Sequence, residues 1–196
     1  MDFTEVVRKR RMVRHFTAEP VAPEAVERIL AAARHAPSAG FTQGQSFVVV
    51  TSPETKARIA ELCGEQEYVA SGFHPFVSGA PVLLIPCTSE AAYHQRYQEA
   101  DKTLPDGAEI TWPVPYWHMD IGCAVMLVLL AAVDEGLAAG FAGTHDLDAL
   151  RTVLGVPDEV TPVGVIPIGH GAADTPSPSL KRGRVPDMQF AHRERW

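Results

Sequence analysis

Cysteine is scarce in this sequence, and its spacing argues against two classes of small scaffold. The 196 residues include three cysteines, Cys63, Cys87 and Cys123, at wide intervals and with no CxxC pair. A disulfide framework uses an even number of cysteines and a zinc knuckle uses close pairs, so neither is expected, nor is a metal site. Thiols that stay reduced indicate a cytoplasmic protein.

A surplus of positive charge is also missing. The formal net charge is -7, which argues against a broad nucleic-acid surface. Basic residues nonetheless gather near both ends, at residues 8–14 and 181–184, and a local anion site is the better interpretation of these clusters. Residues 1–14 are charged and lack an apolar core segment, so no secretory signal is expected.

Long apolar runs are absent, with one candidate to consider. Residues 121–133 carry no charge, but a run of 13 residues is short for a bilayer, which needs about 20. We therefore expect a buried helix and no membrane contact. A chain of this length can bury a core without metal or disulfide support.

Hydrophobic periodicity predicts one α+β domain over residues 1–196. Asp2 and Glu5 have the spacing of a capping box, so the first helix is expected to end near Arg11. Further helices are expected over residues 26–33, 53–63, 91–102 (on the surface), 117–138 and 146–154, and strands, mostly buried, over residues 46–51, 81–86, 140–144 and 160–168. The tail, residues 170–196, is rich in proline, glycine and charge, so we expect it to wrap over a neighbour.

Three arginines, Arg10, Arg11 and Arg14, stand within five residues at the end of the first helix. Their planar donor forks suit a phosphate, and holding them together without an anion is costly. Basic residues at a helix end also complement the helix dipole, which is the ordinary structural explanation. The basic residues of the tail, Lys181, Arg182 and Arg184, are open to the same two readings.

Two segments of small residues favour close approach to a flat ligand. Residues 36–43 include Pro37, Ala39 and Gly40 together with the polar Ser38 and Gln43. Residues 140–144 follow the long helix and expose backbone amides. A helix stop with a turn, and a helix-ending glycine before a strand, explain the same letters without a ligand.

These clusters occur in an order that resembles the nitroreductase-like flavoprotein family. The similar segments are RKRRMVRHF, ILAAARHAPSAGFTQGQSFVVV, DIGCAVMLVLLAAVDEGLAAGFAG, LRTVLGVP and VGVIPIGHG. They cover most of the chain except residues 65–115. The resemblance implies a central mixed sheet flanked by helices and an intertwined homodimer with FMN at the interface. The long helix would then lie in the interface, and the tail would reach around the partner.

By the same resemblance, FMN has three groups of contacts. The arginines Arg10, Arg11 and Arg14 would hold the phosphate and ribityl chain, with Lys181, Arg182 or Arg184 closing on the phosphate. Met12, Pro37, Ser38, Ala39, Phe41 and Gln43 would lie at the ring, the loop residues coming from the other subunit. The amides of Ala142 and Gly143 would face the ring's O4 and N5. FMN would carry electrons from NADH or NADPH to a nitroaromatic, a quinone or a similar planar acceptor by a ping-pong mechanism, so no catalytic side chain is named.

The departures from the family pattern fall among the residues that the resemblance places near the flavin ring. Met12 replaces the usual serine, Phe41 or Thr42 replaces an asparagine, and Gln43, Gly44 and Gln45 replace Gln-Pro-Trp. No counterpart of the family's mid-chain asparagine and lysine is found. These changes bear on the substrate more than on the flavin.

The acceptor pocket is expected to use aromatic side chains. The candidates are Phe41, Trp112, Tyr116, Trp117 and His118, with Phe73 as a further one. A planar acceptor stacks on such rings, while core packing uses the same residues. His118 is also a candidate proton donor to the reduced acceptor.

Two other activities fit the same scaffold. PSAGFTQ and the closing HRERW resemble the branch that cleaves reduced FMN with oxygen to form dimethylbenzimidazole, although residues 139–144 lack that branch's serine and offer only Thr144. A flavin-sequestering protein without turnover is the second alternative. A close variant of the main hypothesis takes electrons from a deazaflavin in place of nicotinamide.

Overall fold

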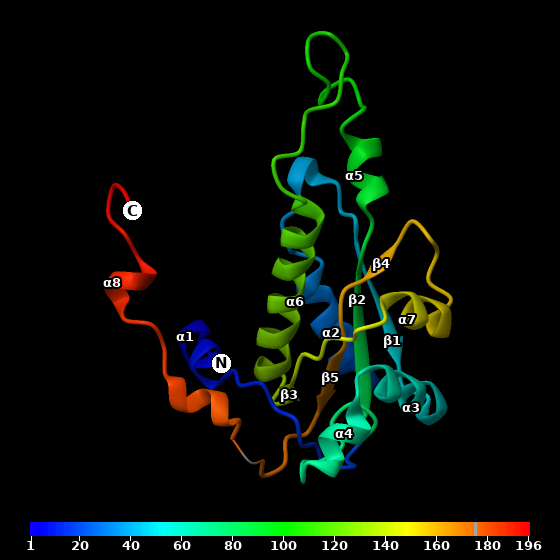
Figure 1. The fold of residues 1–196 in the computed structure, drawn as a ribbon, viewed down its shortest axis with the longest axis vertical. Helices are drawn as coiled ribbons and strands as arrows, with labels where there is room; N and C mark the ends of the chain where they lie inside the picture. The colour runs from blue at the N-terminus through cyan, green and yellow to red at the C-terminus, as the bar shows by residue number, and fades with distance from the viewer. Residues whose placement is uncertain (175) are drawn as a thin grey trace.

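The computed structural model describes residues 1–174 and 176–196 and has the expected α+β class, with a sheet between two layers of helices (Figure 1). The strands are β1 (Gln45–Val50), β2 (Val82–Thr88), β3 (Ala138–Ala139), β4 (Thr161–Pro162) and β5 (Ile166–Gly169). The α-helices are α1 (Phe3–Lys9), α2 (Pro23–Ala33), α3 (Pro53–Leu62), α4 (Glu65–Ala70), α5 (Glu90–Arg96), α6 (Tyr116–Asp134), α7 (Leu147–Leu154) and α8 (Asp187–Phe190). Two 3₁₀ turns, η1 (Ala39–Phe41) and η2 (Pro178–Arg182), complete the order.

Strand β2 divides the core into two halves because it is buried along its whole length. Its alternate residues Val82 and Leu84 face a cluster formed with α2 and α6. Leu83, Ile85 and Cys87 point the other way, into a cluster formed with α3 and α7. The sheet therefore has a helical layer on each face, as Figure 1 shows.

The strand pairs are antiparallel, in the order β1-β2-β5-β3, with β4 also paired to β2. The parallel bridge between Met12 and Ala139 lies outside these strand pairs, so the named strands form an antiparallel sheet and not the mixed sheet that the resemblance implied. The strand expected at residues 160–168 is split into β4 and β5. From Leu84 to Cys87 strand β2 advances three residues while the opposing chain advances four, which is the geometry of a β-bulge.

The central helix α6 is shorter than expected, ending at Asp134 instead of residue 138. Gly136 adopts the left-handed conformation (φ 75°), and the Leu137 amide bonds back to the Ala132 carbonyl at 2.8 Å, which closes the helix. The chain enters β3 directly, so the strand expected at 140–144 begins at 138 and its pairing continues through Ala142.

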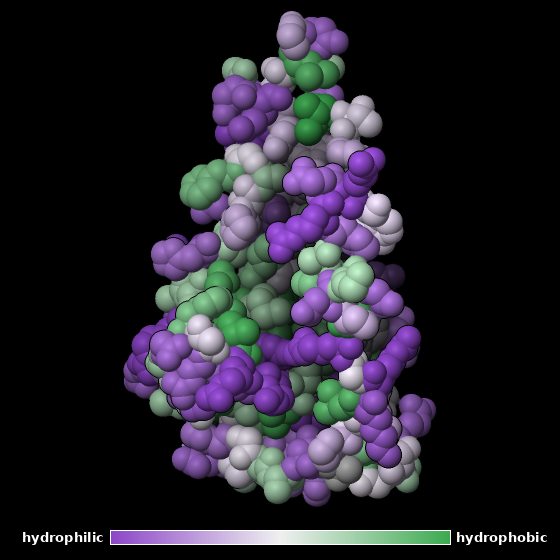
Figure 2. All heavy atoms as spheres, turned by 90° about the vertical axis from the view of Figure 1, so that its left-hand side faces the viewer, coloured by the Kyte–Doolittle hydropathy of each residue, from purple (hydrophilic) through white to green (hydrophobic). Residues whose placement is uncertain are grey.

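One face of α6 is buried in the core and the other is open, so the expected burial holds for one face within a single chain. Ile121, Ala124 and Val128 are buried, whereas Met119 and Met126 are 56% and 46% exposed. Helix α6 is long and apolar enough to cross a membrane by length and composition alone, and 39% of its most apolar stretch is buried; the core helix of a soluble protein has the same length and composition. Figure 2 shows apolar side chains among hydrophilic ones on the side of the molecule that carries α1 and the tail.

Two more expectations need correction. The strand at 46–51 was expected to be buried, but β1 lies at the edge of the sheet, and Val49 is 43% exposed. The helix at 91–102 was expected to be a surface helix, but α5 ends at Arg96 and fully buries Tyr93. Helix α4 was not predicted from the sequence.

The tail leaves the sheet after β5 and carries η2 and α8 (Figure 1). Residues 178–196 are all exposed. Large apolar side chains are among them, with Met188 86% and Phe190 81% exposed. The tail thus holds apolar groups away from its own core.

The N-cap of α7, which the sequence predicted at Asp146, is expected to contribute to stability. The Asp146 carboxylate accepts a hydrogen bond from the Ala149 amide at 2.8 Å. We expect Asp146→Ala to lower the free energy of unfolding by about 1 kcal/mol, because an N-terminal amide loses its partner. Asp148→Ala is the control: Asp148 forms an exposed i,i+3 ion pair with Arg151, and such helix pairs contribute about 0.2–0.5 kcal/mol. Urea unfolding at fixed protein concentration measures both, and equal losses would contradict the capping role.

Candidate functional site

Backbone hydrogen bonds fix the segment that follows α1. The Val13 amide donates to the Ala139 carbonyl at 3.1 Å, beside the Met12–Ala139 bridge. Further along, the Thr17 amide donates to the His170 carbonyl at 2.8 Å. The three segments 12–17, 138–142 and 169–173 therefore lie side by side, which brings the N-terminal arginines to the amides after α6.

This pairing depends on a glycine. A Cβ at Gly140 would lie 2.6 Å from the Val13 carbonyl oxygen, closer than real contacts allow. Gly143 has open space around the same position. In the segment GFAG, Gly140 is therefore required for packing, whereas Gly143 leaves room beside the backbone.

The three arginines of this segment have different surroundings. Arg10 has a buried Nη1 without a hydrogen-bond partner in the described part of the chain. Arg11 turns back and donates from Nη1 to the Arg8 carbonyl and, at 2.9 Å, to the Arg10 carbonyl. The Arg14 amide donates to Asp174 Oδ2 at 3.1 Å. A buried guanidinium nitrogen lacking an acceptor fits an anion that is held there.

The two amides expected at the flavin ring are not equivalent. The Ala142 amide donates to the Val165 carbonyl at 2.8 Å, within the sheet. The expectation that Ala142 presents its N–H to a ring is therefore wrong, because the donor is already used. The Gly143 amide has no such carbonyl partner among the described residues, and Gly143 is exposed.

The 37–43 loop is a tight and strained turn. Ser38 Oγ accepts from the Gln43 amide at 2.9 Å, which closes it. Gly40, Phe41 and Gln43 have positive φ values of 63°, 56° and 56°, and such values are uncommon for residues with side chains. Phe41 is 76% exposed on the outside of the turn. Strained backbone of this kind persists where the surrounding structure holds it.

A cleft of about 610 Å³ lies beside this loop, a size that suits a small planar molecule. It runs between the end of α2 and the start of β1. Its lining combines aliphatic, aromatic and polar groups: Leu30, Ala33, Arg34, His35, Ala36, Pro37, Phe41, Gln43, Gln45, Ser46 and Phe47.

Four of the residues expected at an acceptor pocket form one cluster, whereas Phe41 lies apart and Phe73 stacks on Tyr68, with 4.6 Å between ring centroids. The Trp112 ring centroid lies 6.1 Å from that of Tyr116 and 5.7 Å from that of Trp117, and His118 lies 6.2 Å from Trp117. Trp117 is buried, so core packing accounts for it, whereas His118 is exposed.

Glu109 connects Trp112 to His94. Its carboxylate accepts a hydrogen bond from Trp112 Nε1 at 2.5 Å and contacts His94 Nδ1 at 2.6 Å. The hydrogen bond from Trp112, followed by that from His94, lowers the pKa of the Glu109 carboxyl. The same contact with Glu109 raises the pKa of His94, which favours its protonated form.

The basic residues of the tail are not brought to the arginines within this chain. Lys181, Arg182 and Arg184 are exposed, and the structure shows no ion pair or hydrogen bond from these three side chains within the described residues. Their expected role at a phosphate thus depends on a second subunit or on movement of the tail.

The three cysteines differ in exposure: Cys87 is buried, Cys63 is partly buried and Cys123 is exposed. Burial raises the pKa of the Cys63 and Cys87 thiols to about 11, so neither is a thiolate nucleophile at neutral pH. The described residues contain no group of three or more metal-ligating side chains.

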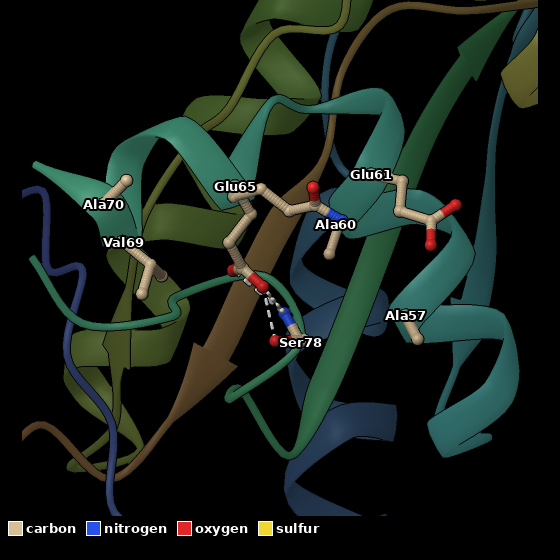
Figure 3. A pocket seen from close by; sticks show the side chains of 8 residues that line it. Ala57, Ala60, Glu61, Glu65, Val69, Ala70 and Ser78 are labelled. Atoms are coloured by element: carbon tan, nitrogen blue, oxygen red, sulfur yellow. Dashed lines mark hydrogen bonds between the residues drawn. The ribbon is translucent and has the colours of Figure 1, made fainter.

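A second hollow, of about 500 Å³, lies between α3 and α4 (Figure 3). Its buried Glu65 carboxylate accepts from the Val77 amide at 2.6 Å and from the Ser78 amide and hydroxyl. Glu65 is thus fully engaged in holding the 77–78 turn.

Taken together, these features describe an α+β protein with an arginine-rich segment, a nearby exposed backbone amide and a tight loop beside a cleft. The family model of the nitroreductase family matches residues 7–170. The chain is 31% identical to the FMN reductase [NAD(P)H] of Bacillus subtilis, with 94% of this chain and 70% of that protein covered. It is 26% identical to an iodotyrosine deiodinase of Haliscomenobacter hydrossis, covering 92% of this chain and 84% of that one.

The fold agrees with that assignment. A nitroreductase family protein from Streptococcus pneumoniae superposes with a TM-score of 0.77 at 24% identity, over 98% of this chain and 100% of that chain. The chain belongs to the nitroreductase family, which confirms the resemblance drawn from the sequence.

Sequence reasoning missed the residues that hold the 37–43 loop. Asp120 accepts from the Ala39 amide, Arg96 donates to the Gly40 carbonyl, and Tyr93 donates to Asp120. One signal was present, because Asp120 is the only charged residue in residues 117–133. A carboxylate in an otherwise apolar helix is costly to bury without partners, so it marks a specific contact.

The Gly140 contact yields a prediction about the site's framework. Gly140→Ala should lower the free energy of unfolding by about 1–3 kcal/mol, since the new methyl group meets a backbone oxygen and not a flexible side chain. Gly143→Ala, with open space, is the matched control and should stay within about 0.5 kcal/mol of the wild type. Thermal and chemical unfolding of both variants measure this. A Gly140→Ala variant as stable as Gly143→Ala would show that the pairing with Val13 is not close-packed.

Proposed function

We propose that the protein is an FMN-dependent oxidoreductase that takes electrons from NADH or NADPH and delivers them, by ping-pong kinetics, to a nitroaromatic, a quinone or a similar planar acceptor. Family membership and the FMN reductase among its relatives support an FMN-dependent NAD(P)H oxidoreductase in general. The observation that carries the proposal is the buried, unpartnered Nη1 of Arg10 beside a backbone framework with a free amide.

The residues present fit FMN. Arg10, Arg11 and Arg14 supply the positive charge that a phosphomonoester requires, and arginine forks match its oxygens. Arg11 must release its carbonyl partners to take part. Lys181, Arg182 or Arg184 would complete the charge from the tail. When bound, FMN supplies the electron-transfer chemistry itself.

The protein's own contribution is to bind and orient. Met12 and the loop residues Pro37, Ser38, Ala39, Phe41 and Gln43 would form the walls against the flat ring, and a dry wall strengthens each polar contact. The Gly143 amide is the donor available to stabilise negative charge on the ring. Phe41 and the Trp112, Tyr116, Trp117 and His118 group would border the acceptor.

A direct test uses the purified protein under anaerobic conditions. Flavin absorption bands that bleach on adding NADH or NADPH, and return on adding p-nitrobenzoate or a quinone, would support the proposal. Parallel lines in double-reciprocal plots would support the ping-pong order. Bound flavin with negligible turnover would instead indicate the sequestering alternative.

The structure argues against Thr144 as a substitute for the serine used in oxygen-dependent cleavage of FMN. The Thr144 hydroxyl donates to the Leu62 carbonyl at 2.9 Å, so it is committed to the connection with α3. Incubating reduced FMN with the protein in air distinguishes the two reactions. Dimethylbenzimidazole would favour the alternative, and simple reoxidation to FMN supports the oxidoreductase.

We also propose that the protein acts as a cytoplasmic homodimer, with α6 at the interface and the tail over the partner. The open apolar face of α6 and the exposed apolar residues of the tail support this arrangement, because both need a cover that one chain does not supply. Neither a nucleic acid nor a membrane is required.

The arginine segment yields a quantitative prediction. Arg10→Ala should raise the dissociation constant for FMN roughly tenfold to a hundredfold, because a hydrogen bond to a charged group contributes about 1.5–3 kcal/mol. Arg8→Ala, an exposed neighbour on α1, should change it less than about twofold. Quenching of FMN fluorescence measures both constants. Equal affinities for wild type and Arg10→Ala would remove Arg10 from the phosphate site.

The interface yields a second prediction. Met126→Asp should shift the protein from dimer to monomer at micromolar concentration, because it places a charge on the open face of α6. Val69→Asp is the control: Val69 is similarly exposed, at 42% against 46% for Met126, but lies on α4. Sedimentation velocity reports the mass. A wild-type monomer, or an unchanged Met126→Asp dimer, would contradict the arrangement.

A further inference from the structure

A single buried carboxylate joins three elements beside the 37–43 loop. Asp120 Oδ2 accepts from the Ala39 amide at 2.8 Å and from the Tyr93 hydroxyl at 2.7 Å. Asp120 lies on α6 and is 8% exposed, and Tyr93 lies on α5 and is fully buried. The carboxylate therefore connects the loop to both helices.

The charge on Asp120 is compensated by these donors. Burying a carboxylate is costly unless it is hydrogen-bonded, and an apolar residue of similar size would often be at least as stable. Burial, followed by the hydrogen bond to Asp120, raises the pKa of Tyr93, so its hydroxyl stays a donor at all ordinary pH values. Stability alone thus does not explain the Asp120–Tyr93 pair, whereas the directional hydrogen bond from the Ala39 amide to Asp120 does.

Helix α5 holds the next residue of the loop. Arg96 Nε donates to the Gly40 carbonyl at 3.0 Å, while its two Nη atoms bind the Asp101 carboxylate, each at 2.7 Å. A Cβ at Gly40 would lie 2.7 Å from the Tyr97 ring. The loop backbone is consequently pressed against α5 and anchored on both sides of the Ala39–Gly40 peptide.

These contacts explain how the strained turn is maintained. Positive φ values at Phe41 and Gln43 directly follow the anchored peptide. Each such residue costs about 1–3 kcal/mol and needs external support. The anchors at Ala39 and Gly40 supply that support and direct Phe41 outward.

We propose that Asp120 is a positioning residue, which fixes the 37–43 loop through Ala39 and Tyr93 in the conformation that meets the flavin ring. The proposal rests on the proposed function, because the loop's ligand is the FMN inferred there. Asp120 contacts the loop backbone, so its effect on the ring would be carried by backbone geometry.

The test compares Asp120→Ala with Asp120→Asn in the full-length protein. Hydrogen exchange of the segment 37–44, measured with and without FMN, should be about tenfold faster in Asp120→Ala, since the Ala39 amide loses its acceptor. The FMN dissociation constant should rise about tenfold and the absorption maximum of bound FMN should shift. Asp120→Asn keeps an oxygen that can accept both hydrogen bonds, so it should restore both values to within about threefold. Tyr93→Phe should give an intermediate effect.

Glu65→Ala is the matched control. Glu65 is another buried carboxylate that accepts from a backbone amide and a hydroxyl, but in the 77–78 turn (Figure 3). Glu65→Ala should lower the melting temperature. The hydrogen-exchange rate of residues 37–44 and the FMN dissociation constant should stay within about twofold of the wild-type values. Equal effects of Asp120→Ala and Glu65→Ala on the loop would overturn the proposal, as would wild-type exchange in Asp120→Ala.

The two proposals fail in different ways. If the wild type does not bind FMN but Asp120→Ala still loosens residues 37–44, the positioning of the loop stands and the cofactor is wrong. If the wild type binds FMN and Asp120→Ala, Asp120→Asn and Tyr93→Phe all keep wild-type affinity and exchange, the inference about Asp120 is wrong and the flavin site stands.

Discussion

The pairing of the Met12–Val13 backbone with Ala139–Gly140 is the contact on which the site depends. It joins the end of α1 to the exit of α6, which are far apart in the sequence. It is possible because residue 140 is glycine, since a Cβ there would lie 2.6 Å from the Val13 carbonyl oxygen. Each hydrogen bond in such a pairing contributes only about 1 kcal/mol, but the register it fixes is specific. That register places the arginine segment beside residues 138–142, and Arg10 has a buried Nη1 without an acceptor in the described part of the chain.

The loop at 37–43 is a second surface, positioned by a different device. It is held by polar contacts from α5 and α6, where Asp120 and Arg96 bind consecutive residues of the backbone. In an intertwined dimer, α6 would be at once the support of this loop and the contact with the partner. One helix would then link subunit assembly with the shape of the flavin site.

The sequence was sufficient where the determinants are local. The cap at Asp2, whose carboxylate accepts from the Glu5 amide, and the cap at Asp146 were both predicted and are confirmed, as was the family. It was insufficient where long-range contacts decide. The bulge between β4 and β5, the edge position of β1 and the commitment of the Ala142 amide to Val165 depend on which strands pair, and periodicity does not specify partners. Asp120 was overlooked because the uncharged run at residues 121–133 begins directly after it, although its charge is isolated in an apolar segment.

The central claim is that the arginine segment holds the phosphate of a flavin mononucleotide, and a comparison of two ligands tests it most directly. FMN and riboflavin share the ring and the ribityl chain and differ in the phosphate, so titrating the flavin-free protein with each isolates that group. The account predicts that FMN binds at least about a hundredfold more tightly, the equivalent of one or two charge-assisted hydrogen bonds. Equal affinity for FMN and riboflavin would contradict it.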